Sequence, residues 1–230
     1  MGEQRVAVVT GGAGAIGSAI VAVLRASGHL TVVLDRTGGI VCDLSSASST
    51  QAAAAEVLER YGRCDVLVHC AGYLDPMPLA ELDLDRWRAL MAVNVEASLW
   101  LVRAFAPGMV DRGFGRIILI SSDGQWFPPS AEFLPYVTSK AALLGVMRTL
   151  AVTYGEDGIA VSAVAPGHTD TPAARAVVAD GALDASIASQ VLKRALVPED
   201  TAHAVAFLAS DGAAAMTGQV LVTDGGAYMR

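Results

Sequence analysis

The stretch RVAVVTGGAGAIGSAI, residues 5–20, contains three structural signals in a row. Residues 5–10 are rich in β-branched side chains, which predicts a buried parallel strand. A glycine-rich turn covers residues 11–17, and residues 18–26 predict a helix that Gly28 would end. Glycine lets the backbone approach a pyrophosphate, and a helix N-terminus favours negative charge. The stretch therefore predicts the first strand, turn and helix of a dinucleotide-binding fold.

The rest of the chain continues the alternation of strand and helix patterns. Strands are predicted at residues 31–35, 40–43, 65–69, 115–121, 159–165 and 219–223, and helices at residues 49–61, 84–110, 136–154 and 199–210. Such alternation implies βαβ units and a parallel sheet with helices on both faces. Right-handed crossovers then give a doubly wound sheet. We expect one Rossmann-like α/β domain over residues 1–230.

Two segments depart from this regular pattern. Only four residues, 36–39, separate the second strand from the third. A parallel crossover usually needs about a dozen residues, so either the helix of this crossover is missing or the third strand pairs only briefly at the sheet edge. Residues 172–197 are the least regular stretch and are rich in small side chains. We expect them to form a substrate lid within the domain.

The composition narrows the class of protein. The chain is 53% hydrophobic and 17% charged, with a net charge of −7. It can bury a large core, and its negative charge disfavours nucleic acid and anionic membranes as partners. Cys42, Cys64 and Cys70 are an odd number of cysteines without metal-ligand spacing. We expect no disulfide framework, no metal site and a cytoplasmic location.

An acidic residue stands where a dinucleotide-binding fold would use one. Asp35 ends the second predicted strand, 18 residues after Gly17, close to the ~20 expected for an acid that binds the ribose 2′-hydroxyl. A carboxylate there repels a 2′-phosphate, so NAD is favoured over NADP. Arg36 follows directly and offers a binding group for that phosphate. The alternative interpretation of Asp35 is a solvated turn residue.

A tyrosine and a lysine carry the predicted proton chemistry. Tyr136 and Lys140 are four residues apart and so share one helix face. Tyrosine is a weak acid at neutral pH, with a reference pKa near ~10, and a nearby ammonium lowers that pKa. Lys140 and Lys193 are the only lysines in the chain. The spacing is common, however, and a surface pair is the alternative.

These motifs stand in an order that resembles the classical short-chain dehydrogenase/reductase family, from about residue 6 to residue 226. The matching pieces are TGGAGAIG (10–17), Asp35, CDL (42–44), CAG (70–72), NV (94–95), SS (121–122), YVTSK (136–140), PGHTDT (166–171) and TGQVLVTDGG (217–226). Each piece is weak alone, but their order and spacing together are specific.

The resemblance implies roles for individual residues. Tyr136 would be the general acid/base, and Lys140 would hold the nicotinamide ribose and lower the tyrosine pKa. Ser122 would bind the substrate oxygen, and Asn94 would hold a water that links Lys140 to solvent. The implied cofactor contacts, apart from Tyr136 and Lys140, are Gly11, Ala15, Ile16 and Gly17 for the pyrophosphate, Asp35 and Arg36 for the ribose, Asp43 and Leu44 for the adenine, Cys70, Ala71 and Gly72 for the ribose side, and Pro166, Gly167, Thr169 and Thr171 for the nicotinamide.

The chain departs from the family pattern at three places. Ala15 replaces the middle glycine of the turn, which a small methyl group allows. His69-Cys70 replaces the usual Asn-Asn pair, so one amide contact beside the cofactor is lost. The short connection after Asp35 removes a helix and leaves the adenine pocket more open.

Four residues are candidates for contact with the substrate. Asp123, Gln125 and Trp126 follow Ser122 directly, and His168 follows the Pro-Gly pair at residues 166–167. As a pocket wall they would set the specificity, and the carboxylate of Asp123 would bind a substrate hydroxyl. The alternative is a pair of loops that face solvent.

The leading hypothesis is an oxidoreductase that uses NAD(H) and acts on a small or cyclic secondary alcohol or its ketone. An NADPH-dependent 3-oxoacyl thioester reductase and a dihydrodiol dehydrogenase are the near alternatives. A non-catalytic NAD-binding regulator is the alternative from another class. Such a protein needs no proton relay, so the complete set of catalytic residues argues against it. The resemblance also implies a homotetramer or homodimer, formed through the long helices and the C-terminal segment.

Overall fold

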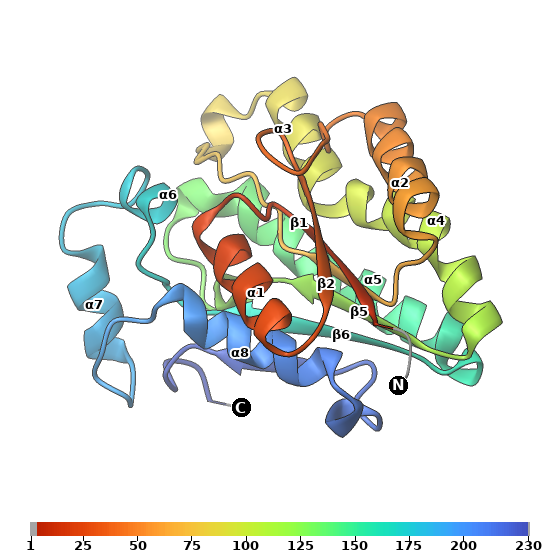
Figure 1. Cartoon of the computed structure of the whole chain (residues 1–230). Helices are drawn as coiled ribbons and strands as arrows, with labels where there is room; N and C mark the ends of the chain where they lie inside the picture. Colours follow the sequence, from red (N-terminus) through yellow and green to blue (C-terminus); the bar gives the residue numbers. More distant parts are fainter. Residues whose placement is uncertain (1–3, 230) are drawn as a thin grey trace.

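A seven-stranded parallel sheet forms the centre of the molecule (Figure 1). The computed structural model describes residues 4–229; residues 1–3 and 230, which the predicted domain includes, lie outside the described residues. The strand order is β3-β2-β1-β4-β5-β6-β7. The strands are β1 Val6–Thr10, β2 Leu30–Asp35, β3 Ile40–Val41, β4 Val66–His69, β5 Gly115–Ile120, β6 Ile159–Pro166 and β7 Val220–Thr223. The predicted Rossmann-like, doubly wound sheet is confirmed.

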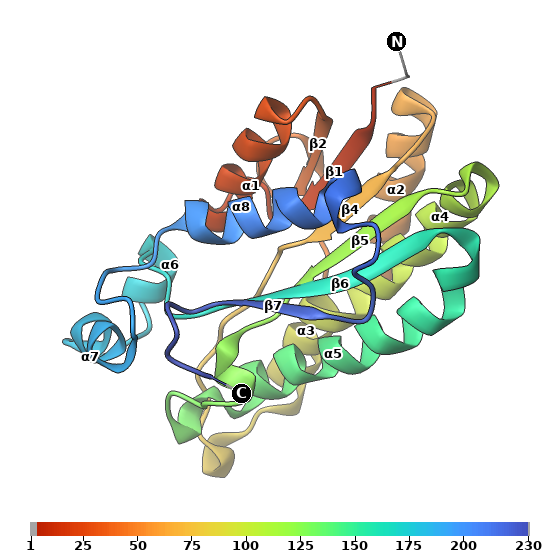
Figure 2. The same cartoon turned by 90° about the horizontal axis from the view of Figure 1, so that it is seen from below.

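Helices cover both faces of the sheet, as Figure 2 shows. The longer helices are α1 Ala15–Ala26, α2 Ala47–Tyr61, α3 Leu84–Met91, α4 Ala97–Arg112, α5 Leu134–Tyr154 and α8 Pro198–Ala209, and the short ones are α6 Pro172–Arg175 and α7 Ala182–Ser189. Helices α1 and α8 lie on one face, and α2, α4 and α5 lie on the other. Each end of α2, α5 and α8 falls within two residues of its prediction.

Neighbouring residues of each strand point to opposite layers of this sandwich. Val8 and Leu67 belong to the core under α2, α4 and α5, whereas Val9 and Val68 belong to the core under α1 and α8. A strand buried on both faces needs apolar side chains at every position. This explains why the central strands appear in the sequence as continuous apolar runs without polar alternation.

The connection between β2 and β3 has no helix, as predicted. Leu34 pairs with Ile40, and Asp35 pairs with Val41, so β3 is a two-residue parallel strand at the sheet edge. Gly39 makes this tight return possible. It has a φ of +67°, and a Cβ atom there would lie 2.4 Å from the main-chain oxygen of Val33. Both alternatives stated for this segment, the missing helix and the brief pairing, are therefore found together.

The helix predicted over residues 84–110 is interrupted. It divides into α3 and α4 around a π-helical turn, Ala92–Glu96, in which the N–H of Ala97 donates to the main-chain oxygen of Ala92. The wider turn directs Asn94 into the protein, where its side chain is fully buried. π-turns of this kind often mark functional positions. Pro107 does not end the helix, since α4 continues to Arg112.

The combined helix Leu84–Arg112 is long and apolar enough to cross a membrane by length and composition alone. Half of its most apolar window is buried inside the protein. This burial is the behaviour of a core helix, which packs its apolar side chains against the sheet.

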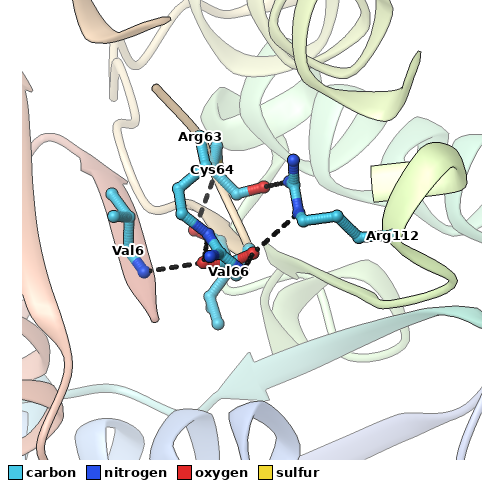
Figure 3. Close-up of polar contacts among 6 residues, drawn as sticks. Val6, Arg63, Cys64, Val66 and Arg112 are labelled. Carbon is cyan, nitrogen blue, oxygen red and sulfur yellow. Dashed lines mark hydrogen bonds and ion pairs between the residues drawn. The ribbon is translucent and has the colours of Figure 1, made fainter. Parts of the chain in front are cut away.

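A buried carboxylate holds the amino ends of β1 and β4 together (Figure 3). Asp65 has no exposed surface, and its Oδ2 accepts from the main-chain N–H of Val6 at 2.8 Å. Arg63 Nε donates to Asp65 Oδ2 at 2.8 Å, and Arg112 Nε lies 3.2 Å from Asp65 Oδ1. Arg112 also donates to the main-chain oxygen of Cys64 at 2.9 Å. Two guanidinium groups therefore balance one buried charge and tie α4 to this end of the sheet.

Candidate active site

The predicted site residues gather at the carboxyl ends of the strands, opposite to Asp65. In open parallel sheets ligands bind at this edge, where the strand order reverses. Here the chain runs outward from β1 to β3 and returns beside β1 as β4. Thr10 and His69, the last residues of β1 and β4, pair across this reversal.

The glycine-rich turn is too tight for larger side chains. Gly11 has a φ of +68°, and a Cβ atom at Gly17 would lie 2.0 Å from the main-chain oxygen of Gly11. Within the described part of the chain, Gly14 starts α1 without a side-chain cap, and no acidic residue lies in the first turn. Ala15 and Ile16 follow, half-exposed. Uncapped N–H groups at a helix start suit an anion, so the turn fits the expected pyrophosphate.

Asp35 lies against this turn. Its Oδ2 accepts from the N–H of Ala13 at 3.0 Å, and its Oδ1 accepts from the N–H of Thr37 at 3.3 Å. The carboxylate is thus held beside the glycine-rich turn, where a ribose would follow the pyrophosphate. Arg36 is exposed next to it.

The loop after β3 contains the residues expected at the adenine. Asp43 Oδ1 accepts from the Ser45 side chain at 2.7 Å and from its main-chain N–H at 3.0 Å, and these bonds lower the pKa of Asp43. The side chain of Leu44 is buried. Asp43 therefore shapes this loop, and most of its carboxyl group stays in contact with solvent.

His69 connects β1 to the π-turn. Thr10 Oγ1 accepts from the N–H groups of Cys70 and Ala71, both at 3.1 Å. Because both lone pairs of this oxygen are used, the Thr10 hydroxyl donates its hydrogen to His69 Nδ1, 3.1 Å away. His69 Nε2 then carries the ring proton and donates to the main-chain oxygen of Asn94 at 3.2 Å. Burial, assisted by the charge of Lys140, lowers the pKa of His69 to about 4. The imidazole is therefore neutral, with its proton on Nε2.

The side chain of Asn94 continues this network to the helix that carries Tyr136. Its Oδ1 accepts from the main-chain N–H of Tyr73 at 2.6 Å. Its Nδ2 donates to the main-chain oxygen of Tyr73 at 3.0 Å and to Ser139 Oγ at 2.9 Å. Ser139 Oγ donates in turn to the main-chain oxygen of Tyr136 at 2.7 Å. Asn94 thus fixes both the loop after β4 and the first turn of α5.

Lys140 lies beside Tyr136, as the four-residue spacing predicts. Its Nζ is 5.6 Å from the centre of the Tyr136 ring and donates to the main-chain oxygen of Ile120 at 2.8 Å. Burial lowers the pKa of Lys140 to about 8. Burial also raises the pKa of Tyr136 to about 12, against a smaller lowering by the Ser122 side chain. Burial, and not the ammonium of Lys140, therefore sets the direction of the shift in the pKa of Tyr136, opposite to the lowering expected from the sequence.

The loop after β5 positions Ser122. Ser122 Oγ accepts from the N–H of Gly124 at 3.1 Å. Gln125 turns back toward this loop: its Nε2 donates to Ser121 Oγ at 3.0 Å and to the main-chain oxygen of Ser122 at 2.9 Å. Ser121 Oγ donates to the main-chain oxygen of Lys140 at 2.8 Å. Gln125, expected to touch substrate, thus braces the loop that carries Ser122.

Trp126 lies between this loop and the C-terminal segment. Its ring stacks on Tyr228, with the ring centres 5.2 Å apart and the planes within 1° of parallel. The segment that ends in Tyr228 therefore packs against the loop after β5, which carries Ser122.

The segment after β6 passes from the sheet to the predicted lid. Pro166 ends β6, and a Cβ atom on Gly167 would lie 2.9 Å from Asp224. Thr169 Oγ1 donates to the main-chain oxygen of Gly167 at 3.0 Å, and Thr171 Oγ1 accepts from the N–H of Ala174 as the cap of α6. His168, directly before Thr169, is half-buried.

The cysteines have no thiolate character. Burial raises the pKa of all three thiols, that of Cys70 to about 12. All three thiols are free, and over residues 4–229 no three His, Cys, Asp or Glu side chains form a group that could hold a metal ion. The N–H groups of Cys70 and Ala71 donate to Thr10 Oγ1. Gly72 leaves space beside Lys140, whose Nζ would be 3.5 Å from a Cβ atom there.

Several residues that build the site were not identified from the sequence. His69 was seen only as a lost amide contact, and Ser121, Ser139 and Tyr73 were not singled out. Their roles depend on contacts between segments far apart in the chain, such as that of Thr10 with His69, which are 59 positions apart. The only signal was that His69 departs from the family pattern.

Comparisons with known proteins agree with this geometry. A family model described as enoyl-(acyl carrier protein) reductase matches residues 12–228. The cis-4-hydroxycyclohexanecarboxylate dehydrogenase of Sinomonas cyclohexanicum is 34% identical over 98% of each chain. The acetoacetyl-CoA reductase of Allochromatium vinosum is 31% identical over 98% of this chain and 99% of its own.

A solved structure has the same fold. A protein from Beutenbergia cavernae, described as an NAD(P)-dependent gluconate 5-dehydrogenase with NADP bound at low occupancy, superposes with a TM-score of 0.88. It is 34% identical, and the match covers 96% of this chain and 95% of that one.

Proposed function

The chain belongs to the short-chain dehydrogenase/reductase family, and we propose that it transfers a hydride between NAD(H) and a small or cyclic secondary alcohol or its ketone. One observation carries the proposal. The buried Lys140 lies beside Tyr136 on α5, next to Ser122 and at the sheet edge that holds the glycine-rich turn. This arrangement joins a proton-transfer group to a dinucleotide cradle.

The residues have distinct tasks in the oxidation of the alcohol. Ser122 Oγ binds the substrate oxygen, and Tyr136 Oη takes the hydroxyl proton. The bound cofactor supplies the hydride acceptor for the carbinol carbon and, in its oxidised form, a positive charge that favours the phenolate. The products are a ketone, the reduced cofactor and one proton. Lys140, whose pKa burial lowers to about 8, holds the ribose. Its ammonium form stabilises the phenolate of Tyr136.

Asn94 has a supporting task. Its side chain is committed to Tyr73 and Ser139, so it holds the first turn of α5 and thereby Tyr136. Its main-chain oxygen accepts from His69. A carbonyl oxygen has two lone pairs, which leaves one for the water expected to link Lys140 to solvent.

The preference for NAD over NADP is supported by Asp35. Its carboxylate lies against the glycine-rich turn, where the extra phosphate of NADP would meet a like charge. The B. cavernae structure contains NADP, so the comparison does not favour NAD. The preference proposed for this chain depends on whether the repulsion by Asp35 outweighs the attraction of Arg36 for the 2′-phosphate. Initial rates with each cofactor at matched concentrations test it directly.

A second candidate function is the reduction of a 3-oxoacyl thioester. The description of the family model and the acetoacetyl-CoA reductase relative favour it. Such an enzyme would need cations for a phosphorylated carrier. One of the two lysines is buried beside Tyr136, so arginines would have to supply most of them. The test is the oxidation of NADH and NADPH with acetoacetyl-CoA as substrate.

The decisive experiment is a panel of secondary alcohols and ketones, including ring compounds and dihydrodiols, followed by the absorbance of the reduced nicotinamide. Turnover of an alcohol or its ketone supports the proposed function. Cofactor binding without turnover of any compound, thioesters included, contradicts it and supports a nicotinamide-binding regulator.

Assembly and the lid are further parts of the proposal. A hollow between α4 and α5, lined by Leu99, Val102, Pro107 and Tyr154 among others, is largely apolar and open. It suits a contact between copies of this chain, and light scattering should find a homodimer or homotetramer.

Residues 172–197 would close over the substrate. They are attached to the C-terminal segment where the N–H groups of Val191 and Leu192 donate to the main-chain oxygen of Gly225. A cytoplasmic location and the absence of membrane partners stay predictions.

A further inference from the structure

A carboxylate lies beside the two groups that would hold the substrate oxygen. Asp123 directly follows Ser122, at the start of a short turn after β5. Its Oδ1 lies 3.4 Å from Ser122 Oγ, and its charge contributes to raising the pKa of Tyr136. The Ser122 side chain is also the hydrogen-bond partner of the Tyr136 hydroxyl, so the carboxylate lies next to the serine that joins the two groups.

The acceptor positions of Asp123 are only partly used. The nearby Asp224 accepts from the N–H groups of Gly226 at 2.8 Å and Tyr228 at 2.7 Å, so protein donors satisfy its two oxygens. Between residues 4 and 229, Asp123 has no ion pair, and apart from N–H groups of its own turn its one side-chain partner is Ser122 Oγ. An ionised carboxylate offers about four acceptor positions.

Asp123 is nevertheless partly shielded from water. Burial, together with the charge of Asp224, raises the pKa of Asp123 to about 6. The group is thus ionised at neutral pH, although its surroundings disfavour the charge. A shielded carboxylate without a cation is costly unless donors reach it, and in this position a donor can come from a bound substrate.

We propose that Asp123 binds a hydrogen-bond donor on the carbon next to the reacting carbon, so that the substrate is a 1,2-diol, the matching hydroxy ketone, or a 1,2-amino alcohol. The inference rests on the proposed function and specifies its substrate class. A substrate oxygen bound to Ser122 Oγ lies about 2.8 Å from it. Asp123 Oδ1 is 3.4 Å from the same Oγ, so a donor one carbon away comes within hydrogen-bond reach.

The reaction itself is unchanged by this contact. The reacting carbon gives its hydride to the oxidised cofactor, and its hydroxyl proton goes to Tyr136, while the second donor stays bound to Asp123. The carboxylate repels substrates with a carboxylate or phosphate on the neighbouring carbon. It also gains nothing from a 3-oxoacyl thioester, whose neighbouring carbon has no N–H or O–H group.

The test compares three ring compounds: cyclohexanol, cyclohexane-1,2-diol and 2-aminocyclohexanol. For each, kcat and KM are measured with saturating NAD in the wild type, D123A, D123N and the control D85A, which removes a carboxylate with an exposed fraction of 94%. The wild type should favour the diol or the amino alcohol over cyclohexanol by about tenfold. D123A should lose this preference, mostly through the KM of the diol or the amino alcohol, whatever change in kcat the three compounds share. D85A should leave all three compounds unchanged.

The variant D123N separates the two kinds of donor. Its amide oxygen still accepts from a hydroxyl, so a preference for the diol should persist in part. A preference for the ammonium group depends on charge and should disappear. Thermal melting and cofactor binding of each variant show that it is folded.

Three results decide the inference. The inference is wrong if the wild type has a kcat/KM for cyclohexanol that equals or exceeds those for the diol and the amino alcohol. It is also wrong if D123A lowers kcat/KM equally for all three compounds. In both cases the oxidoreductase function stands. The inference is also wrong if the broad panel finds its best substrate among alcohols without a neighbouring donor. If no alcohol or ketone is turned over at all, the proposed function itself fails.

Discussion

His69 Nε2 lies 3.2 Å from the main-chain oxygen of Asn94, and this contact joins the end of β4 to the π-turn between α3 and α4. On its other side the ring accepts from Thr10. One neutral imidazole therefore couples the glycine-rich turn after β1 to the segment that holds the first turn of α5.

Replacing His69 by Leu should lower both stability and turnover. The substitution leaves the Thr10 hydroxyl and the Asn94 oxygen without their partner, and each unsatisfied buried group costs about 1–3 kcal/mol. We expect the free energy of unfolding in urea to fall by about 2 kcal/mol or more, and kcat to fall more than the KM for cofactor rises. The control is H203L, because His203 is exposed on α8. An H69L variant as stable and active as H203L would contradict this role.

The same histidine should give stability a dependence on pH. Its pKa is lowered by burial from 6.5 to about 4, so the unfolded chain binds a proton that the folded protein refuses between these values. The stability that the neutral ring provides is complete above pH 6.5 and is lost as the pH falls toward 4, by at most about 1.4 kcal/mol per unit. Asp123, whose pKa is raised to about 6, changes stability in the opposite direction over much of this range. The measurement is therefore the difference in unfolding free energy between wild type and H69L, which should shrink as the pH falls from 6.5 to 4.

Replacing Tyr136 by Phe should remove turnover and leave cofactor binding intact. Loss of a positioned acid/base group lowers rates by about 10²–10⁴-fold. Tyr136 is half-buried and Phe has the same shape, so the fold should be kept. Steady-state rates and the quenching of protein fluorescence by NADH separate the two effects, with Y61F as a control at the end of α2. Full activity in Y136F would refute the proposed proton transfer.

Replacing Asp35 by Asn should improve the use of NADP relative to NAD. The amide removes the negative charge but still accepts from one of the two N–H groups that Asp35 now binds, those of Ala13 and Thr37. We expect the ratio of kcat/KM for NADP to that for NAD to rise by about tenfold, the effect of one unfavourable charge contact near the surface. D85N is the matched change at an exposed carboxylate. An unchanged ratio in D35N would mean that Asp35 does not set the cofactor preference.

Replacing Asp65 by Asn should destabilise the protein without altering the site. The neutral amide leaves the guanidinium groups of Arg63 and Arg112 facing each other at the amino ends of β1 and β4. Breaking a buried ion pair costs about 3–5 kcal/mol, and we expect about 3 because both arginines keep some contact with water. Urea unfolding measures the loss. The kcat of the folded fraction should match wild type, since Asp65 lies at the opposite end of the sheet; a changed kcat with unchanged stability would contradict this.

The sheet, the glycine-rich turn and the Tyr136–Lys140 pair follow from local patterns. Residues 5–20 predict β1, the turn and α1 because buried parallel strands and glycine turns leave a short-range signal. The close approach of Tyr136 and Lys140 follows from helix geometry alone. The absence of a helix after β2 follows from the four residues available between Asp35 and Ile40.

Other features depend on contacts that no local pattern contains. The π-turn at residues 92–96 adds one residue to a turn, and the apolar periodicity of the helix hides it. Gln125 braces the loop after β5 because its amide donates to the Ser121 hydroxyl, which in turn donates to the main-chain oxygen of Lys140. The pKa of Tyr136 depends on how much water the whole fold removes, which spacing between a tyrosine and a lysine does not reveal.

The stacking of Tyr228 on Trp126 has a practical consequence for handling the enzyme. Whatever is fused behind Tyr228, an affinity tag, a reporter or a surface linker, extends from a segment that packs on a wall of the candidate site. The start of β1 lies at the amino ends of the strands, opposite to the candidate site (Figure 2). Purification handles and immobilisation chemistry therefore belong at the N-terminal end of the chain.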